Sequence, residues 1–392
     1  MIKASKIFNY PLFALGFRPF FVLAGLSALF LMLVWNAILK GTIPSNHYLP
    51  GNYWHAHEML IGYTGAVIAG FLLTAVKNWT GYETVTYDKL AGLCLLWLYG
   101  RIVPFYAGEL PDSLIALTDL LFLPLLAYFL SKPILNSGNP RHWLFIGLLL
   151  LISVGNALIH AQFLGYTTAS ANIGLQLILA TIITMILVIA GRVFPFFTER
   201  GLPGTLAIRS PQMDLLAICS AILVFTLQLS GISGAFLAIA AVVCAIINTV
   251  RISGWFVSRI WYVPLLWILY LGYGWIILGF LFMALAAFNL VAGDLALHAF
   301  TLGGIGILTL GMMARVGLGH TGRAIKACNT ITIAFALLNL CAFLRIMLPV
   351  ALPAQFAILF YIATLAWLAA FSLFMFIYLP ILSKPRIDNV EG

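Results

Sequence analysis

Apolar residues occupy long runs of the chain, and short polar breaks separate them. Each run has about 20 residues, which is enough for a helix to cross ~30 Å of hydrocarbon while satisfying its own backbone hydrogen bonds. The predicted spans are 17–39, 58–77, 88–107, 113–131, 143–160, 170–196, 213–231, 234–251, 262–287, 295–316, 327–349 and 354–382. The pattern predicts an all-α, polytopic membrane helix bundle of about twelve transmembrane helices, forming a single domain over 1–392.

The charged residues test this count independently. If both termini lie in the cytoplasm, only Lys40, Arg101 and Arg345 of the 20 lysines and arginines fall on the outer side. The positive-inside rule predicts this asymmetry. A chain that is 63% hydrophobic and 8% charged cannot cover a soluble surface. The net charge of +9 therefore reflects membrane topology, and it does not indicate nucleic-acid binding.

The first apolar run has no small-residue cleavage site after a short core, so it is expected to be a retained helix rather than a signal peptide. The five cysteines lack CxxC and CxxCH spacing. They therefore predict no disulfide framework, no zinc site and no covalent c-type haem.

Two segments share a spacing. Counting from His57 and from His298, the same offsets give a set of glycines and one threonine. The matched pairs are Gly62 and Gly303, Gly65 and Gly306, Gly70 and Gly311, Thr80 and Thr321, and Gly81 and Gly322. The threonines lie 23 residues on, about 35 Å along a helix, so each copy crosses the bilayer with its histidine at the outer end.

The spacing from Arg192 to Thr198 equals that from Arg315 to Thr321. If this match is significant, helices two, six and ten are equivalent and the bundle is an internal repeat of three groups of four. The segment around Arg192 lacks the glycines and the histidine, so it supports the repeat less strongly than the other two copies do.

Most histidines fall in one layer of the predicted topology. His47, His55, His57, His160 and His298 lie on the outer side, whereas His142 and His320 lie on the inner side. A buried imidazole needs a partner or a function, and neutral imidazoles suit both copper and haem iron. The candidate metal ligands are His55, His57, His298 and His160, and His320 is a separate inner-side candidate. The alternatives are interfacial residues of an aromatic belt, or interhelical hydrogen bonds.

His55 and His57 admit two arrangements. If both are helical, they lie about 200° apart and serve opposite faces of one helix. If instead the helix begins at Glu58, both converge on one ion from the preceding turn.

Several polar residues are candidate partners of these ligands. Asp294 precedes His298 by four residues, the spacing at which a carboxylate accepts the second ring N–H. Asn156 stands in the same relation to His160, and Glu58 follows His57. Asp119 is another costly group within a span, and we expect it to pair with a neighbour rather than to conduct protons.

Arg101 and Arg345 each end a helix on the outer side, where a guanidinium could bind a haem propionate bidentately. Simple snorkelling to the interface explains them equally well.

Motifs along most of the chain resemble those of the NnrS family. They are Gly16-Phe17-Arg18-Pro19-Phe20-Phe21, Trp54-His55-Ala56-His57-Glu58-Met59, Gly70-Phe71-Leu72-Leu73-Thr74-Ala75-Val76 with Asn78-Trp79-Thr80-Gly81, Gly191-Arg192-Val193-Phe194-Pro195-Phe196-Phe197, and Met312-Met313-Ala314-Arg315-Val316 with Leu318-Gly319-His320-Thr321-Gly322-Arg323. Lys77 departs from the pattern, where proline is expected, and this puts no ligand in doubt.

This resemblance implies a multi-pass protein of the bacterial inner (cytoplasmic) membrane. It also implies non-covalent b-type haem and copper, and a role in nitric oxide metabolism during denitrification or nitrosative stress. Three functions stay open: a haem-copper redox enzyme that reduces NO, a non-enzymatic NO or metal sensor, sink or maturation factor, and a secondary transporter. The expected partners are nitric oxide and the lipid bilayer.

Overall fold

The computed structural model describes residues 8–43 and 48–388. His47, one of the predicted outer-side histidines, lies outside the described residues. Within them the chain is helical, and contiguous helical segments join into twelve rods. Eleven of these rods are long and apolar enough to span a membrane. The predicted all-α, polytopic membrane bundle is confirmed.

The remaining rod is α4 (Tyr87–Ile102), whose 16 residues make a short span. It continues as a 3₁₀ turn (Val103–Tyr106) because Pro104 cannot extend the α-helical hydrogen bonding. At the usual rises of the two helix types, the combined segment is about 32 Å long and crosses a hydrocarbon core of ~30 Å.

The contacts divide the chain into two compact units, which we describe separately. The first comprises 1–178, 316–324 and 374–392, and the second comprises 179–315 and 325–373. Three of the four boundaries fall inside α8 (Ser170–Gly201), α13 (Ile307–Gly319) and α16 (Phe356–Ser383), and the fourth lies in the connection that follows α13.

The first unit is built mainly from the amino-terminal rods. They are α1 (Phe17–Leu39), α2 (Asn52–His57) with the π-helix η2 (Glu58–Tyr63) and α3 (Thr64–Thr80), α4, α5 (Asp112–Leu120) with α6 (Phe122–Ser137), and α7 (Trp143–Phe163). The α2–η2–α3 rod is the most enclosed span of the chain, with 83% of its apolar window buried. Gly70 lets α3 approach α1 closely, since a Cβ there would meet Phe20 and Phe21 at 3.0 Å or less.

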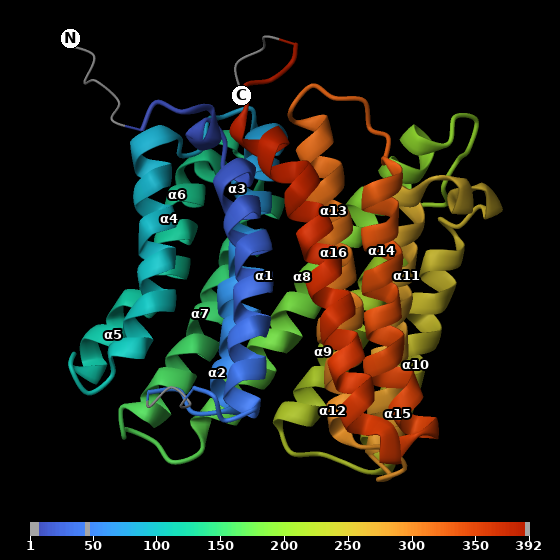
Figure 1. Ribbon diagram of the computed structural model, residues 1–392. Helices are drawn as coiled ribbons and strands as arrows, with labels where there is room; N and C mark the ends of the chain where they lie inside the picture. Colours follow the sequence, from blue (N-terminus) through green and yellow to red (C-terminus); the bar gives the residue numbers. More distant parts are fainter. Residues whose placement is uncertain (1–7, 44–47, 389–392) are drawn as a thin grey trace. The chain divides into compact units, whose positions relative to one another are not determined.

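Both ends of the described chain lie at one end of the first unit. The amide of Phe8 donates to Asp88, and Arg386 donates to the carbonyl of His320. Arg18 of α1 donates to the carbonyls of Leu382 and Lys384. Figure 1 shows α2 and α5 at the opposite end of this unit. An even number of membrane crossings places both ends of a chain on the same side of the membrane, which agrees with this arrangement.

The second unit contains most of the remaining rods. They are α9 (Pro211–Leu229), α10 (Ala235–Ser253), α11 (Pro264–Ala286), α12 (Gly293–His298) with the π-helix η6 (Ala299–Gly306) and most of α13, and α14 (Asn329–Ala342) with the π-helix η7 (Phe343–Met347) and α15 (Leu348–Ala351). Only 22% of the apolar window of α9 is buried, so most of this helix is available to lipid.

The repeat predicted from sequence has a structural counterpart. His57 and His298 are each the last residue of a six-residue α-helix, and a π-helix begins immediately after each of them. At the far end, Gly81 and Gly322 adopt φ of 74° and 76°. In contrast α8, the third proposed member, runs as α-helix throughout. Two copies thus share this geometry, and the three-times-four repeat stays a prediction.

Candidate metal centre

The side chain of His57 is placed by an abrupt change of helix type. The chain winds as α-helix through His57 and as π-helix over Glu58–Tyr63. Such π segments are rare and are frequent at functional sites, because the extra residue per turn redirects the side chains. The two side chains at the junction of the α- and π-helix are enclosed, since His57 and Glu58 are each only 1% exposed.

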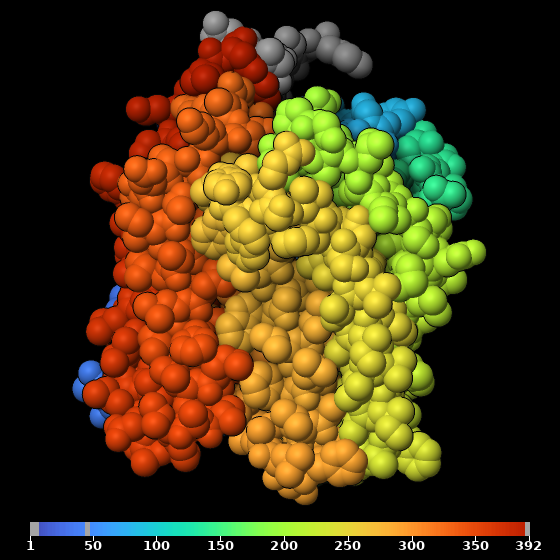
Figure 2. All heavy atoms as spheres, turned by 90° about the vertical axis from the view of Figure 1, so that its right-hand side faces the viewer, coloured from blue at the N-terminus to red at the C-terminus, as the bar shows by residue number. Residues whose placement is uncertain are grey.

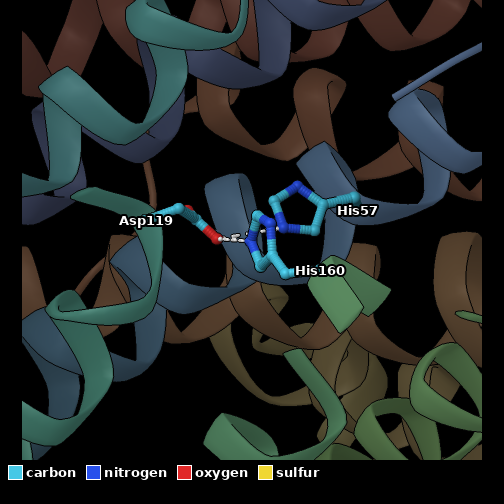
Figure 3. Close-up of side chains that lie close together, drawn as sticks. All are labelled: His57, Asp119 and His160. Carbon is cyan, nitrogen blue, oxygen red and sulfur yellow. Dashed lines mark hydrogen bonds and ion pairs between the residues drawn. The ribbon is translucent and has the colours of Figure 1, made fainter. Parts of the chain in front are cut away.

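Two further helices bring an acid and a second imidazole to His57. Asp119 lies near the end of α5 and His160 in the last turn of α7, and both are buried. The Nε2 atoms of His57 and His160 lie 3.1 and 2.9 Å from Oδ2 of Asp119. Figure 3 shows both rings directed at this one carboxylate oxygen. Asn156, one turn before His160, donates to the same oxygen at 2.7 Å.

Each imidazole is held through its other nitrogen. Nδ1 of His57 lies 3.1 Å from Oε1 of Glu58, and Nδ1 of His160 lies 2.7 Å from the hydroxyl of Tyr48. Metal-ligating histidines usually donate Nδ1–H or Nε2–H to an outer partner in this way, which fixes the tautomer and frees the other nitrogen for the metal. Both histidines therefore present Nε2 to a common point.

The donor geometry fits a small metal ion. One ring nitrogen each of His57 and His160 and one oxygen of Asp119 all lie within 4.8 Å of one another. Around an ion with bonds of about 2.0 Å, tetrahedral ligand atoms are separated by about 3.3 Å. The observed separations of 2.9 and 3.1 Å need to grow only slightly to admit an ion. Two imidazoles and a carboxylate suit copper, whereas a haem iron takes one or two axial donors.

The charges around these donors do not cancel. Arg101 donates to Glu58 at 2.8 Å and forms an ion pair with Asp119. One cation thus faces two buried carboxylates, which leaves one excess negative charge while both imidazoles are neutral. An uncompensated buried charge is costly, so the cluster favours either a proton on an imidazole or a bound monovalent cation.

Small residues make room for this cluster. A Cβ on Gly62 would lie 3.0 Å from Oε2 of Glu58, and one on Gly100 would lie 3.0 Å from Oδ1 of Asp119. Oε2 of Glu58 is buried and makes no hydrogen bond in the described part of the chain.

His55 does not join the cluster. The helix begins at Asn52 rather than at Glu58, so His55 and His57 are both helical and serve different faces. The ring of His55 stacks on Trp35 of α1, with centroids 4.6 Å apart and planes inclined by 12°. The arrangement in which both imidazoles converge on one ion is therefore not the one observed.

Asn156 has a different partner from the one that its spacing predicts. Its amide bonds Asp119, and its Oδ1 lies 3.0 Å from Nε2 of His57, while His160 binds Tyr48 and Asp119 instead. The position of Asn156 one turn before His160 does not decide its partners, because α5 and α2 supply nearer polar groups, Asp119 and His57.

The second unit holds His298 in a simpler environment. Its Nδ1 lies 2.7 Å from the backbone carbonyl of Asp294, rather than from the carboxylate that the spacing predicts. The carboxylate of Asp294 instead pairs with Nη2 of Arg345 at 3.3 Å. Nη1 of Arg345 is buried without a hydrogen-bond partner in the described residues, and the guanidinium lies over Phe356. Nε2 of His298 is thus free to act as a ligand beside an incompletely satisfied cation.

His320 lies in the first unit, at the end that carries the chain termini. Its Nε2 is 3.4 Å from Nδ2 of Asn78, and its ring packs on Phe17. Burial and the nearby positive charges of Arg386, Lys77 and Arg18 lower the pKa of His320 to about 4. The imidazole is therefore neutral at physiological pH.

Sequence reasoning missed two residues of the centre. Asp119 was expected only to pair with a neighbour, yet it is the point on which both histidines converge. A buried acid within a span was the available signal. Tyr48 lies in a loop, where burial raises the pKa of its phenol. No sequence pattern distinguishes this tyrosine from the other aromatic residues at the interface.

These features define a polytopic membrane protein with a buried histidine–carboxylate centre at one end of its helices. The family model described as NnrS protein matches residues 11–386, which is nearly the whole chain. The chain therefore belongs to the NnrS family, whose members are membrane proteins linked to the nitric oxide response, and the resemblance of its motifs is confirmed. No curated protein matches the chain.

Proposed function

We propose that this protein binds copper and haem in the bacterial inner membrane and acts on nitric oxide. The observation that carries the copper assignment is the shared direction of two Nε2 atoms toward one oxygen of Asp119. His57, His160 and Asp119 would hold the ion, and Glu58 and Tyr48 would orient the two imidazoles. The charge rule puts this centre on the periplasmic side.

We assign haem binding to His298. Its Nδ1–H is engaged by a backbone carbonyl, so Nε2 is the free donor that an axial ligand needs. The unsatisfied Nη1 of Arg345 fits a propionate at the same end of the unit. Arg101 was the other candidate for a propionate, but it is occupied by Glu58 and Asp119. We therefore give Arg101 a positioning role at the copper centre.

Copper and haem iron supply reversible binding of NO and one-electron exchange with it. The chain would contribute the fixed imidazole tautomers, an apolar enclosure that excludes water, and a carboxylate that balances metal charge. These properties serve reduction of NO, and they equally serve a sensor or sink without turnover. A secondary transporter needs neither bound metal nor fixed tautomers, so the convergent donors favour the first two functions.

Metal analysis and an optical spectrum of the purified protein test the proposal. We expect about one copper per chain, and a Soret band that shifts when NO is added. His57→Ala and His160→Ala should lose copper and keep the Soret band, whereas His298→Ala should do the opposite. His55→Ala is the matched control, because this ring stacks on Trp35 outside both sites. A wild-type protein without copper and haem would contradict the proposal.

Turnover is a separate question. If the protein is an enzyme, purified protein with an artificial electron donor should consume NO continuously. Spectral binding without consumption would remove the enzyme and leave the sensor or sink.

A further inference from the structure

A second buried ion pair lies in the second unit, away from every residue assigned above to a metal. Arg251, in the last turn of α10, is only 3% exposed, and its Nε and Nη2 lie 2.8 and 2.6 Å from Oδ1 of Asp214 in the first turn of α9. Nη1 donates to the hydroxyl of Tyr273, which in turn donates to Asn248. The network fixes the guanidinium in one orientation.

A family motif is built around this pair. A Cβ on Gly191 would lie 2.4 Å from Nη2 of Arg251 and 2.8 Å from Oδ1 of Asp214, so only glycine fits there. Phe194 of the same motif packs against Trp255 and Tyr273. The pair is therefore a constructed feature of the fold and not an incidental surface contact.

The pair opens onto a cavity of about 320 Å³ between the first turn of α9 and the last turn of α10. This volume is at the lower end of the range for ligand sites, ~300–1,000 Å³. Charged and polar groups line it together with apolar side chains: Asp214, Arg251, Ser210, Ser253 and Trp255, with Ile208, Met213 and Val250. Figure 2 shows this face of the second unit, with the α10–α11 connection in yellow at its upper end.

Both the acceptors and the donors that line the cavity can form further hydrogen bonds. Oδ2 of Asp214 and the indole N–H of Trp255 make no hydrogen bond in the described chain, and the hydroxyl of Ser210 only accepts one, from Met213. Asp214 can therefore accept from an ammonium group, while Trp255 and Ser210 can donate to an anion beside the Arg251 cation. Since Arg251 and Asp214 cancel, the cavity suits a zwitterion better than an anion.

The cavity also lies where lipid headgroups are found. It is formed by the ends of two membrane-spanning helices, at the end that the charge rule assigns to the cytoplasm. Ile208 and Val250 line it and are themselves 71% and 54% exposed, so an apolar surface continues from the cavity toward the acyl region.

We propose that this cavity binds the headgroup of a phospholipid that carries phosphoethanolamine. The phosphate would lie against Arg251 and accept from Trp255 and Ser210, and the ammonium would donate to Asp214. A choline headgroup has no N–H to donate to Asp214, and a glycerol headgroup has no cation. The assignment is independent of the proposed metals.

Native mass spectrometry of the full-length protein tests the assignment. The protein in detergent is mixed with equal amounts of phosphatidylethanolamine and phosphatidylglycerol that have identical acyl chains. We expect one retained phosphatidylethanolamine per chain with a preference of about tenfold, the usual effect of one charge-assisted hydrogen bond. Equal retention of the two lipids would overturn the proposal.

Variants localise the lipid. Asp214→Asn should abolish the preference. Val250→Trp should fill the cavity and displace the lipid without touching the ion pair, which keeps the test valid if Asp214→Asn does not fold. Val243→Trp, on the lipid-accessible surface of the same helix at 46% exposure, is the matched control and should retain the lipid. Retention by Val250→Trp equal to that by Val243→Trp would overturn the site.

Soluble competitors separate a lipid from a free headgroup compound. Inorganic phosphate and O-phosphoethanolamine at millimolar concentration should leave the bound lipid in place, because they lack the acyl chains that the apolar wall accommodates. Displacement by either compound would show that the cavity binds a soluble phosphate compound, and the lipid assignment would be wrong.

Discussion

Replacing Asp119 by asparagine isolates the charge of the proposed copper centre. The side chain keeps its size and one oxygen, but the cluster of Glu58, Asp119 and Arg101 changes from one excess negative charge to none. In the wild type, a bound monovalent ion makes the cluster neutral. In the Asp119→Asn protein, the same ion leaves one buried positive charge. At ~4 Å and an effective dielectric constant of about 20, one such Coulomb interaction amounts to about 4 kcal/mol. This corresponds to ~10³-fold weaker binding of Cu(I).

The assay is an anaerobic titration of the purified protein against a chromogenic Cu(I) chelator. Glu109→Gln, which changes an exposed carboxylate in the loop before α5, is the matched control and should bind copper as the wild type does. Size-exclusion profiles and melting temperatures establish that the Asp119→Asn protein is folded. A folded Asp119→Asn protein whose dissociation constant stays within about threefold of the wild-type value would refute the charge argument.

Three further predictions concern other parts of the chain. His298→Ala should remove most of the Soret absorbance while leaving the copper content unchanged, as measured by spectroscopy and metal analysis. His320 resists protonation in the folded protein, with a pKa of about 4, whereas an unfolded histidine titrates near 6.5. Its contribution to stability is therefore complete above about pH 6.5 and is lost as the pH falls toward 4, so His320→Gln should flatten the dependence of melting temperature on pH across this window. Gly174→Ala should destabilise the first unit by about 1–3 kcal/mol in a denaturation assay, because its Cβ would collide with the carbonyl oxygen of Gly155. Gly147→Ala, whose Cβ would meet nothing within 4 Å, should leave stability unchanged.

The helices could be predicted from sequence because hydrocarbon imposes one solution on the backbone, namely internal hydrogen bonding over about 20 residues. The depth of His57 and His160 followed from the same topology. Their lateral convergence did not, since hydropathy carries no information about which helices are neighbours. Asp119 illustrates the difference. Its burial in a span was evident, but its position opposite two imidazoles depends on the packing of α5 against α7.

The π-helices set a second limit on sequence prediction. A count of 100° per residue holds through His57 and fails from Glu58 onward, because a π-helix has more residues per turn. The two partner pairs predicted from four-residue spacing fail for a different reason, since both pairs lie in α-helix, in α12 and α7, and nearer polar groups decide their contacts. His298 binds the backbone carbonyl of Asp294 instead of its carboxylate, and Asn156 bonds Asp119 and His57 instead of His160.

The two copies of the repeat now differ in a way that bears on what each can hold. In each copy a histidine ends an α-helix at the start of a π-helix, with its Nδ1 engaged. Nε2 of His57 faces Asp119 and Asn156, whereas Nε2 of His298 makes no hydrogen bond in the described residues. His57 meets a second imidazole and two acids, which make a small, negatively charged, three-donor centre suited to an ion. His298 stands beside Arg345, whose Nη1 still lacks a partner, and this combination suits a large group that needs one axial donor and carries its own carboxylates. The same change from α- to π-helix, with different neighbours, would thus serve the two different cofactors that we propose.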